Sequence, residues 1–370
     1  MFALKPDYLD SKRRIDAFWE CELIDRPVVQ FGVAKPPEER VPLPVSGHAT
    51  SAERWLDVEY QAELHLASLS NAEFLGDTMP LAWPNLGPEI FAAFYGCPIH
   101  FGDYGTSWTD PILHDWDQVE SLQMDWQNPY LLKLHEMTDA FLEIGKNKFI
   151  TGMTDWHPGG DCVAAFRDPQ NLAMDLMTHR DEVVALLGRI EKDYCAVYDV
   201  FYEKLRAAGQ PISTWTSLVS DEKYYVPSND FSIMISPAMF EEVFLPGIIR
   251  ECQFLTHTIY HLDGPGALRH LDALLSIPEL NAVQWVPGAG NENFARWIPV
   301  YKRIQAAGKG IQVLCAYDEL DLVMETLNPH GMFLSVRSVP SREAGLDMLD
   351  RLTKWCTGKV HPVVKPDDQA

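Results

Sequence analysis

Short apolar runs alternate with helix-like segments along most of this chain, and that alternation constrains the fold more than any other feature. Each apolar run has the length of a buried parallel strand, and a segment with helical periodicity follows it. Eight such units, without a detectable internal repeat, predict an α/β protein built as a (β/α)8 TIM barrel. The expected strands lie at 27–33, 71–75, 149–153, 211–217, 258–263, 282–286, 311–314 and 331–336.

The expected barrel forms a single domain over residues 1–357. Residues 78–147 follow the second expected strand and contain few regular patterns. A stretch of this length inside a compact fold is typical of an insertion or lid that carries function. We expect residues 358–370 to form a disordered tail.

An N-terminal helical extension is expected before the first strand, at residues 8–22. Ile15, Phe18 and Trp19 can form one apolar stripe on this helix, while its other positions are charged or polar. Such a stripe packs on one end of a barrel or at a subunit contact. A homodimer is therefore one of the assemblies that the sequence allows.

The composition restricts the partners and the location of the protein. Its 370 residues carry a net charge of -23, which repels phosphate backbones and anionic membranes, so we expect neither nucleic acid nor membrane as a partner. No run approaches the roughly 18 apolar residues of a membrane helix, and the first residues lack the pattern of a signal peptide. The seven cysteines never form a CxxC pair, which is typical of reduced thiols in a cytoplasmic protein.

The stretch 258–266, Thr-Ile-Tyr-His-Leu-Asp-Gly-Pro-Gly, is typical of a buried strand that ends in a tight turn before a helix. Alternate residues of a strand point the same way, so His261 and Asp263 share a face. Polar groups at the carboxyl end of a buried strand are where α/β enzymes carry their chemistry, and we expect both to be catalytic. The alternative is a histidine that satisfies a neighbour and an aspartate that caps the next helix.

The carboxyl ends of all expected strands converge on one pocket in a barrel. An imidazole, a thiol and a carboxylate can hold a zinc ion, and the expected ligands are His261 and Asp263 from one strand and Cys315 from another. The alternative for Cys315 is a buried core thiol. Asp77 is expected as a catalytic acid or base, or else as an ordinary turn residue. The residues expected to contact substrate are Trp156, His157, Tyr225, Asp230, Trp285, Asn291 and Arg337.

Three segments resemble the uroporphyrinogen decarboxylase superfamily, and they are more similar to its corrinoid-dependent methyltransferase branch. They are Ile-Ser-Pro-Ala-Met-Phe-Glu-Glu-Val-Phe-Leu-Pro at 235–246, Tyr-His-Leu-Asp-Gly at 260–264 and Ala-Val-Gln-Trp-Val-Pro-Gly-Ala-Gly at 282–290. The order of elements matches over residues 70–355. The resemblance implies a (β/α)8 barrel, a zinc ion held by His-x-Cys and a later Cys, and a separate corrinoid protein that carries the methyl group.

Asp263 stands where that branch has the first cysteine of its zinc site, while His261 and Cys315 match the other two ligands. A carboxylate makes a harder site than a thiolate, which favours a substrate with an O- or N-methyl group over a thiol. The leading hypothesis is therefore a methyltransferase, or demethylase, that acts between a small methyl donor and a corrinoid protein. The sequence names neither the substrate nor the direction of transfer.

Two alternatives remain open at this point. The first is a cofactor-free decarboxylase or lyase that uses Asp77 and His261 as acid and base. Asp77 matches an aspartate of the decarboxylase itself, but the arginine-rich N-terminal motif of that enzyme is missing. The second is a non-catalytic member of the superfamily, because the cysteine expected at 263 is absent.

Overall fold

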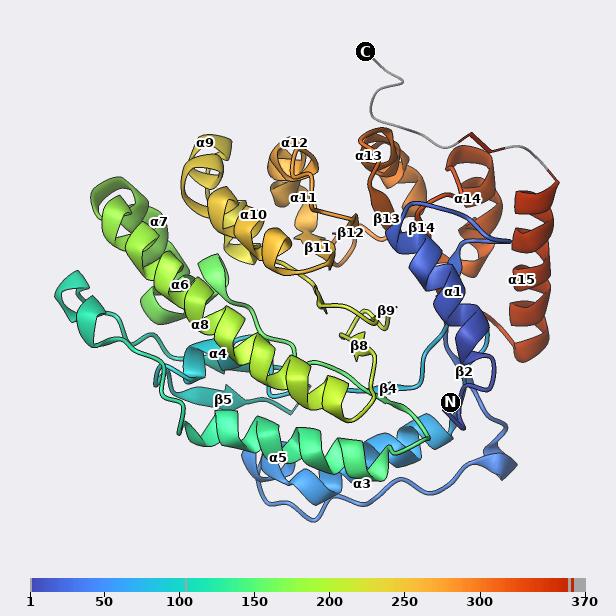
Figure 1. The fold of residues 1–370 in the computed structure, drawn as a ribbon, viewed down its shortest axis with the longest axis horizontal. Helices are drawn as coiled ribbons and strands as arrows, with labels where there is room; N and C mark the ends of the chain where they lie inside the picture. The colour runs from blue at the N-terminus through green and yellow to red at the C-terminus, as the bar shows by residue number, and fades with distance from the viewer. Residues whose placement is uncertain (1, 104, 359–360, 363–370) are drawn as a thin grey trace.

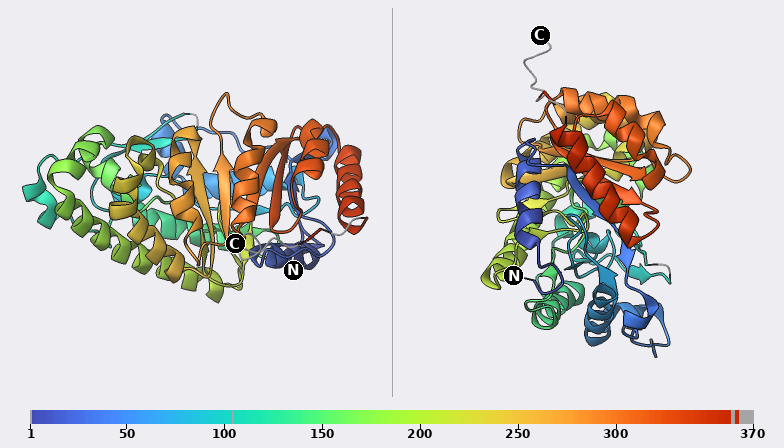
Figure 2. Two further views of the ribbon diagram at one scale, coloured as in Figure 1. Left: turned by 90° about the horizontal axis from the view of Figure 1, so that it is seen from above. Right: turned by 90° about the vertical axis from the view of Figure 1, so that its right-hand side faces the viewer.

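The computed structural model describes residues 2–103, 105–358 and 361–362 (Figure 1). Its main sheet has six parallel strands in the order β1-β14-β13-β12-β11-β10. The sheet is curled, and helices cover its outer side (Figure 2). The strands are β1 (Val28–Phe31), β2 (Val33–Ala34), β3 (Ala72–Glu73), β4 (Leu81–Ala82), β5 (Ile99–Phe101), β6 (Ser107–Thr109), β7 (Ile150–Thr151), β8 (Ile212–Ser213), β9 (Val219–Ser220), β10 (Tyr224–Tyr225), β11 (His257–Asp263), β12 (Ala282–Val286), β13 (Gly310–Ala316) and β14 (Met332–Arg337).

Helices follow the strands of the main sheet, as the alternating sequence pattern predicts. Several begin at caps that can be read from the sequence. One is Ser236, whose hydroxyl accepts the backbone N–H of Met239 and which is followed by Pro237 at the first helical position. The helices are α1 (Tyr8–Trp19), α2 (Ser51–Leu56), α3 (Val58–Ser70), α4 (Ile90–Ala93), α5 (Pro129–Ile144), α6 (Gly159–Arg167), α7 (Pro169–Thr178), α8 (Arg180–Ala207), α9 (Pro237–Met239), α10 (Leu245–Phe254), α11 (Gly264–Ala267), α12 (Leu271–Leu275), α13 (Phe294–Ala306), α14 (Leu320–Thr326) and α15 (Arg342–Thr357), with shorter turns η1 (Pro37–Glu39), η2 (Trp116–Ser121), η3 (Asp230–Met234), η4 (Phe240–Phe244), η5 (Leu268–His270) and η6 (Tyr317–Glu319).

The expected α/β class with parallel strands is confirmed. The strands predicted at 27–33, 258–263, 282–286, 311–314 and 331–336 correspond to five members of the main sheet, β1 and β11 to β14. The sixth member, β10, lies in a segment expected to be a loop. It has two residues, both buried, and it pairs with the start of β11. A strand this short leaves no periodicity in the sequence.

The second expected strand, at 71–75, is wrong as a barrel strand. Its centre forms β3, which pairs antiparallel with β2 beside the main sheet. Continuous pairing of eight strands is not seen in the part of the chain that the structure describes. Instead, β4 pairs with β7 and β8 pairs with β9 as separate two-stranded units. Single backbone hydrogen bonds connect these units to their neighbours. The N–H of Asp77 donates to the carbonyl of Val29 at 2.8 Å, and the N–H of Met153 donates to the carbonyl of Ser213 at 2.8 Å.

The N-terminal helix α1 packs on the amino end of the sheet, as its apolar stripe predicts. Ile15, Phe18 and Trp19 are at most 3% exposed. Phe18 packs edge-on against Phe333 of β14, and Trp19 stacks on His257, the first residue of β11. This end of the sheet is therefore covered, and the opposite, carboxyl end remains for a functional site.

Residues 78–147 contain β4, α4, the β5–β6 hairpin, η2 and α5, so part of the predicted insertion contributes a strand that pairs with β7. Its role as a lid stays a prediction. The tail predicted to be disordered, residues 358–370, lies outside the described residues except for 358 and 361–362.

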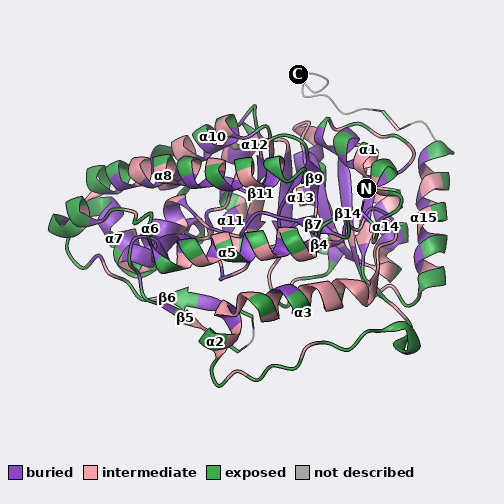
Figure 3. Ribbon diagram, turned by 60° about the horizontal axis from the view of Figure 1, so that its bottom comes forward, coloured by how far each residue is buried: buried purple, intermediate pink, exposed green. Residues whose placement is uncertain are grey.

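The sheet is buried, whereas the outer faces of α5, α8 and α15 are exposed (Figure 3). Among the described residues, none of the helices has the length and apolar character needed to span a membrane.

Candidate functional site

The carboxyl end of β11 carries His261 and Asp263 on one face, as predicted. Both are partly exposed, while Leu262 between them is 1% exposed and faces the core. Gly264 follows with a φ of 75° and makes the turn into α11. The Asp263 side chain makes no capping hydrogen bond to that helix, so the capping alternative is not what the structure shows.

His261 stands at the end of a row of hydrogen-bonded side chains that crosses neighbouring strands. Gln312 Nε2 donates to Ser335 Oγ at 3.0 Å, and Gln284 Nε2 donates to Gln312 Oε1 at 2.7 Å. Gln284 Oε1 is then an acceptor, so His261 Nδ1 donates to it at 2.5 Å. This bond places the imidazole proton on Nδ1 and leaves the lone pair of Nε2 free for a ligand.

Asp230, the first residue of η3, faces that lone pair. Its Oδ1 lies 4.0 Å from His261 Nε2 and is buried without a hydrogen-bond partner among the described residues. Burial, and next the charge of Asp161, raises the pKa of Asp230 to about 6. A buried carboxylate oxygen without a partner is costly, and a bound cation or a proton would remove that cost.

A second imidazole and carboxylate lie on the other side of Asp230. His157 Nδ1 is 3.6 Å from Asp161 Oδ2, and His157 Nε2 is 3.4 Å from Asp155 Oδ1. Burial lowers the pKa of His157, but its two carboxylate neighbours outweigh burial and raise that pKa well above 6.5. His157 is therefore an imidazolium at neutral pH.

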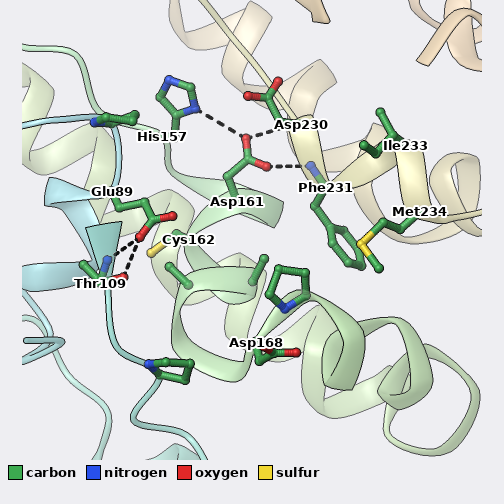
Figure 4. Close-up of a pocket in the computed structure, with 15 residues that line it drawn as sticks. Glu89, Thr109, His157, Asp161, Cys162, Asp168, Asp230, Phe231, Ile233 and Met234 are labelled. Carbon is green, nitrogen blue, oxygen red and sulfur yellow. Dashed lines mark hydrogen bonds and ion pairs between the residues drawn. The ribbon is translucent and has the colours of Figure 1, made fainter. Parts of the chain in front are cut away.

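Asp161 ties η3 to the first turn of α6. Its carboxylate accepts the backbone N–H groups of Asp230 at 3.0 Å and Phe231 at 2.8 Å (Figure 4). Burial raises the pKa of Asp161, but the hydrogen bond and charge of His157 and these two N–H groups together lower it below 3.8. An ionised Asp161 thus fixes the backbone that carries Asp230.

Asp230 is shared by two groups of possible metal ligands. Ligand atoms of Asp230, His261 and Asp263 lie within 4.8 Å of one another, and so do those of His157, Asp161 and Asp230. Imidazole nitrogen and carboxylate oxygen suit zinc and similar divalent ions. The first group fits such an ion better, because its imidazole has a free lone pair while His157 holds a proton. We call Asp230, His261 and Asp263 the acidic triad.

A cavity of about 450 Å³ adjoins the triad at Asp230 (Figure 4). Its size suits a small organic molecule. The charged side chains in its wall are one imidazolium and four carboxylates, so a neutral or cationic molecule fits better than an anion. The lining residues are Pro88, Glu89, Thr109, Pro111, His157, Asp161, Cys162, Ala164, Ala165, Asp168, Pro169, Asp230, Phe231, Ile233 and Met234.

A solved structure has the same fold over nearly the whole chain. A methyltransferase from Methanosarcina mazei matches with a TM-score of 0.60, over 96% of this chain and 99% of that one, at 11% sequence identity. The likeness shows the fold. No protein-family model and no curated protein sequence matches this chain. At such low identity, the activity of the neighbour is a property of that protein alone.

Four predicted site residues come together in this fold. His157, Asp230, His261 and Asp263 come from three separate segments, and the other three lie around the carboxylate of Asp230. The structure therefore supports the predicted convergence at the carboxyl end of β11. Catalytic, substrate and metal roles for these residues stay predictions.

Cys315 is not part of the group, which corrects its prediction as a zinc ligand. It lies in β13, three positions after Gln312, whose side chain belongs to the row that reaches His261. Side chains alternate along a strand, so the thiol faces the opposite side, beside Tyr301 of α13. It is 0% exposed, and burial raises its pKa to about 12. The alternative, a buried core thiol, describes it correctly.

Asp77 is a buried ion-paired residue, which favours a structural role, and its role as a catalytic acid or base stays a prediction. Its carboxylate is 0% exposed and pairs with Arg26 and, at 3.3 Å, with Arg14 of α1. It also accepts the backbone N–H of Val29 at 2.9 Å. These partners lie where α1 covers the sheet, whereas the triad lies at the carboxyl end of β11.

The predicted aromatic wall lies largely inside the core. Trp156 and Tyr225 are each 1% exposed, and the backbone N–H of Trp156 donates to the Tyr225 hydroxyl at 2.8 Å. Trp285 is 0% exposed and packs against Trp297 of α13, with ring centroids 4.9 Å apart. These three side chains do not line the cavity, and contact with substrate stays a prediction for them. His157 does line the cavity.

Asn291 lies in the loop after β12, Arg337 is the last residue of β14, and neither lines the cavity beside the triad. Arg296 Nη1 donates to Asn291 Oδ1 at 2.6 Å, and Arg337 Nη2 donates to the carbonyl of Glu292 at 3.4 Å. Arg337 is exposed. The two side chains therefore meet the same loop at the rim, and contact with substrate stays a prediction for both.

The sequence reasoning missed Asp161 and Gln284, which hold the site in place. Asp161 follows Pro-Gly-Gly at the start of a helix, a place where acidic residues are common for capping alone. Gln284 lies in the middle of an apolar strand segment and is buried. A polar residue at such a position needs a hydrogen-bond partner, and this could have indicated a role in the site.

Proposed function

We propose that this protein is a methyltransferase that moves a methyl group between a small O-methyl or N-methyl compound and a corrinoid protein. The observation that carries the proposal is the acidic triad, Asp230, His261 and Asp263, at the carboxyl end of β11. The fold shared with the Methanosarcina mazei methyltransferase supports the same reaction class. The absence of a thiolate in the triad favours oxygen or nitrogen substrates over thiols.

The triad residues would hold a divalent cation, with zinc as the expected ion. The free Nε2 of His261 and the buried, unpaired Oδ1 of Asp230 fit that role. When bound, the cation would polarise the oxygen or nitrogen atom from which the methyl group departs. Gln284 holds the imidazole in the tautomer that this ligation needs.

The other residues of the site would bind the substrate and handle its proton. His157, protonated between Asp155 and Asp161, can donate a proton to the departing oxygen or nitrogen. The acidic wall of the cavity would favour a neutral or cationic methyl donor. Ile233 and Met234 line the cavity and are 49% and 45% exposed, so an apolar surface is available for the corrinoid protein.

Two broader features belong to the same proposal. We infer that the main sheet, β4, β7 and β8 form a distorted (β/α)8 barrel, in which the two-residue β10 beside the start of β11 is not counted as one of the eight strands. The pairing of β4 with β7 and the backbone hydrogen bonds from Asp77 to Val29 and from Met153 to Ser213 support this order. The unpaired state of all seven cysteines is in keeping with a cytoplasmic protein.

Metal analysis of protein purified without chelator tests the triad. We expect about one divalent ion per chain in the wild type and a loss of at least tenfold in affinity in His261→Ala and Asp263→Asn. Cys315→Ser is the matched control, because its thiol faces the helices, and it should keep the ion. Loss of the ion in Cys315→Ser with retention in Asp263→Asn would reverse the assignment.

The reaction is tested with a corrinoid protein in its Co(I) state and a panel of O-methyl and N-methyl compounds. Methyl transfer changes the visible spectrum of the corrinoid, and His261→Ala should abolish that change. Release of carbon dioxide from a small carboxylic acid, without any corrinoid change, would favour the cofactor-free lyase. A chain that binds neither the cation nor any methyl donor would fit the non-catalytic alternative.

A further inference from the structure

A second cavity lies between α8 and α10, apart from the one beside the triad. Its volume is about 110 Å³, which is room for several water molecules or a ligand of on the order of five non-hydrogen atoms. The residues that line it are Pro158, Gly159, Gly160, Val184, Leu187, Glu191, Tyr194, Ser228, Asn229, Glu242, Val243, Phe244, Pro246, Gly247, Ile248, Arg250 and Glu251.

One buried oxygen atom in its wall, Asn229 Oδ1, has no hydrogen-bond partner among the described residues, and Asn229 is 4% exposed. Beside it lies the carboxyl group of Glu251, a residue that is 9% exposed, whose neighbour is the hydroxyl of Tyr194, a donor. Asn229 is held against Gly160, where a Cβ would lie 2.6 Å from Asn229 Oδ1. A buried amide oxygen without a partner is rare and costly, and its place beside a buried carboxyl group indicates a ligand that donates hydrogen bonds.

The charges around the cavity leave one carboxylate without a cation. Glu191 pairs with Arg250 at 2.6 Å, and Glu242 pairs with Arg180 at 2.5 Å. Glu251 has no such partner in the described part of the chain, and burial raises its pKa to about 8. A cation with N–H groups in the cavity would compensate the carboxylate and could also donate a hydrogen bond to Asn229 Oδ1.

The rest of the wall is apolar and reaches the surface. Leu187, Val243, Phe244 and Ile248 surround the polar atoms, and the last three are at most 6% exposed. Val184 at the rim is 46% exposed, so the cavity opens to solvent there. The ligand therefore needs a short apolar chain as well as a charged donor.

We propose that this cavity binds a small alkylammonium ion, with Glu251 as its counter-ion and Asn229 Oδ1 as a hydrogen-bond acceptor. The ammonium group supplies three N–H donors, which suit both the carboxylate of Glu251 and the unpaired oxygen of Asn229. The alkyl chain lies against the apolar wall between α8 and α10. The site does not depend on the proposed methyl transfer, because it shares no side chain with the acidic triad.

Calorimetric titration with n-butylammonium tests the proposal. The buffer contains phosphate in place of an amine and is set to about pH 8.5, above the pKa of Glu251 and below that of an alkylamine. We expect saturable binding of butylammonium and at least about tenfold weaker binding of 1-butanol and of butanoate. Equal binding of 1-butanol would overturn the role of the charge.

Variants identify the place of binding. Glu251→Gln keeps the shape of the side chain and should weaken butylammonium binding at least about tenfold. Leu187→Trp fills the cavity while Glu251 stays in place, and it should abolish binding. His261→Ala should bind butylammonium as the wild type does, which separates this site from the triad. Unchanged affinity in both Glu251→Gln and Leu187→Trp would overturn the proposal.

Discussion

The substitution Asp77→Asn tests whether this aspartate is structural, as its contacts indicate, or catalytic. The carboxylate is fully buried and neutralises Arg26, whose side chain is 6% exposed, and it also contacts Arg14. An asparagine keeps the shape but leaves the Arg26 guanidinium buried without its counter-charge. Breaking a buried ion pair in this way costs about 3–5 kcal/mol, a large share of the stability of an ordinary domain.

Urea unfolding followed by tryptophan fluorescence measures that loss. Asp10→Asn is the matched control in α1, because Asp10 is exposed and its contact with Arg13 spans 4.0 Å, so it should cost less than about 1 kcal/mol. Adding Arg26→Met to Asp77→Asn should cost less than the sum of the single changes, since the two residues are partners. A loss below about 1 kcal/mol in Asp77→Asn, together with abolished methyl transfer, would refute the structural role.

Three further predictions concern buried side chains of the site and its surroundings. Gln284→Leu frees the tautomer of His261 and should weaken cation binding about 10–100-fold, as measured by competition with a chelating dye. Trp285→Ala should cost about 3–5 kcal/mol in urea unfolding without changing the cation content, because Trp285 packs against α13. Glu251→Gln should remove a fall in stability between pH 4.5 and about 8, which amounts to at most about 5 kcal/mol and is measured by urea unfolding at both ends of that range.

The sign of the Glu251 effect follows from proton binding. The unfolded carboxyl releases its proton near 4.5, whereas the folded carboxyl retains it until its pKa of about 8. Between these values the folded state binds more protons, so the free energy of unfolding falls as the pH rises. The difference between wild type and Glu251→Gln isolates this group. An equal pH dependence in both proteins would contradict the assigned burial of the charge.

The longer strands of the fold could be predicted because each is a buried apolar run. Strands β11 to β14 have five to seven residues and stand out against their flanking turns. The two-residue strands β4 and β10 carry no such signal, since their pairing depends on neighbours far along the chain. The run at 71–75 has strand composition, but only tertiary contacts decide that it pairs with β2.

The sequence predicted the arrangement of site residues that lie on one strand. It could not predict which residues from different strands meet. His261 and Asp263 share a face because they are two positions apart in β11. Cys315 also closes a strand, but its parity relative to Gln312 turns the thiol toward the helices. Which face of β13 carries Cys315 is known only once the structure shows that Gln312 belongs to the row of inward-facing side chains. For Asp77, the deciding partners are two arginines, which lie 63 and 51 positions earlier in the chain.

The most direct test of the triad is anomalous diffraction from crystals of protein purified without chelator. The account predicts one strong peak at the carboxyl end of β11, about 2.0–2.2 Å from His261 Nε2 and from an oxygen of Asp230 or Asp263. A peak within bonding distance of the Cys315 sulfur would contradict the account. So would a fully occupied ion elsewhere in the protein with no peak between Asp230, His261 and Asp263.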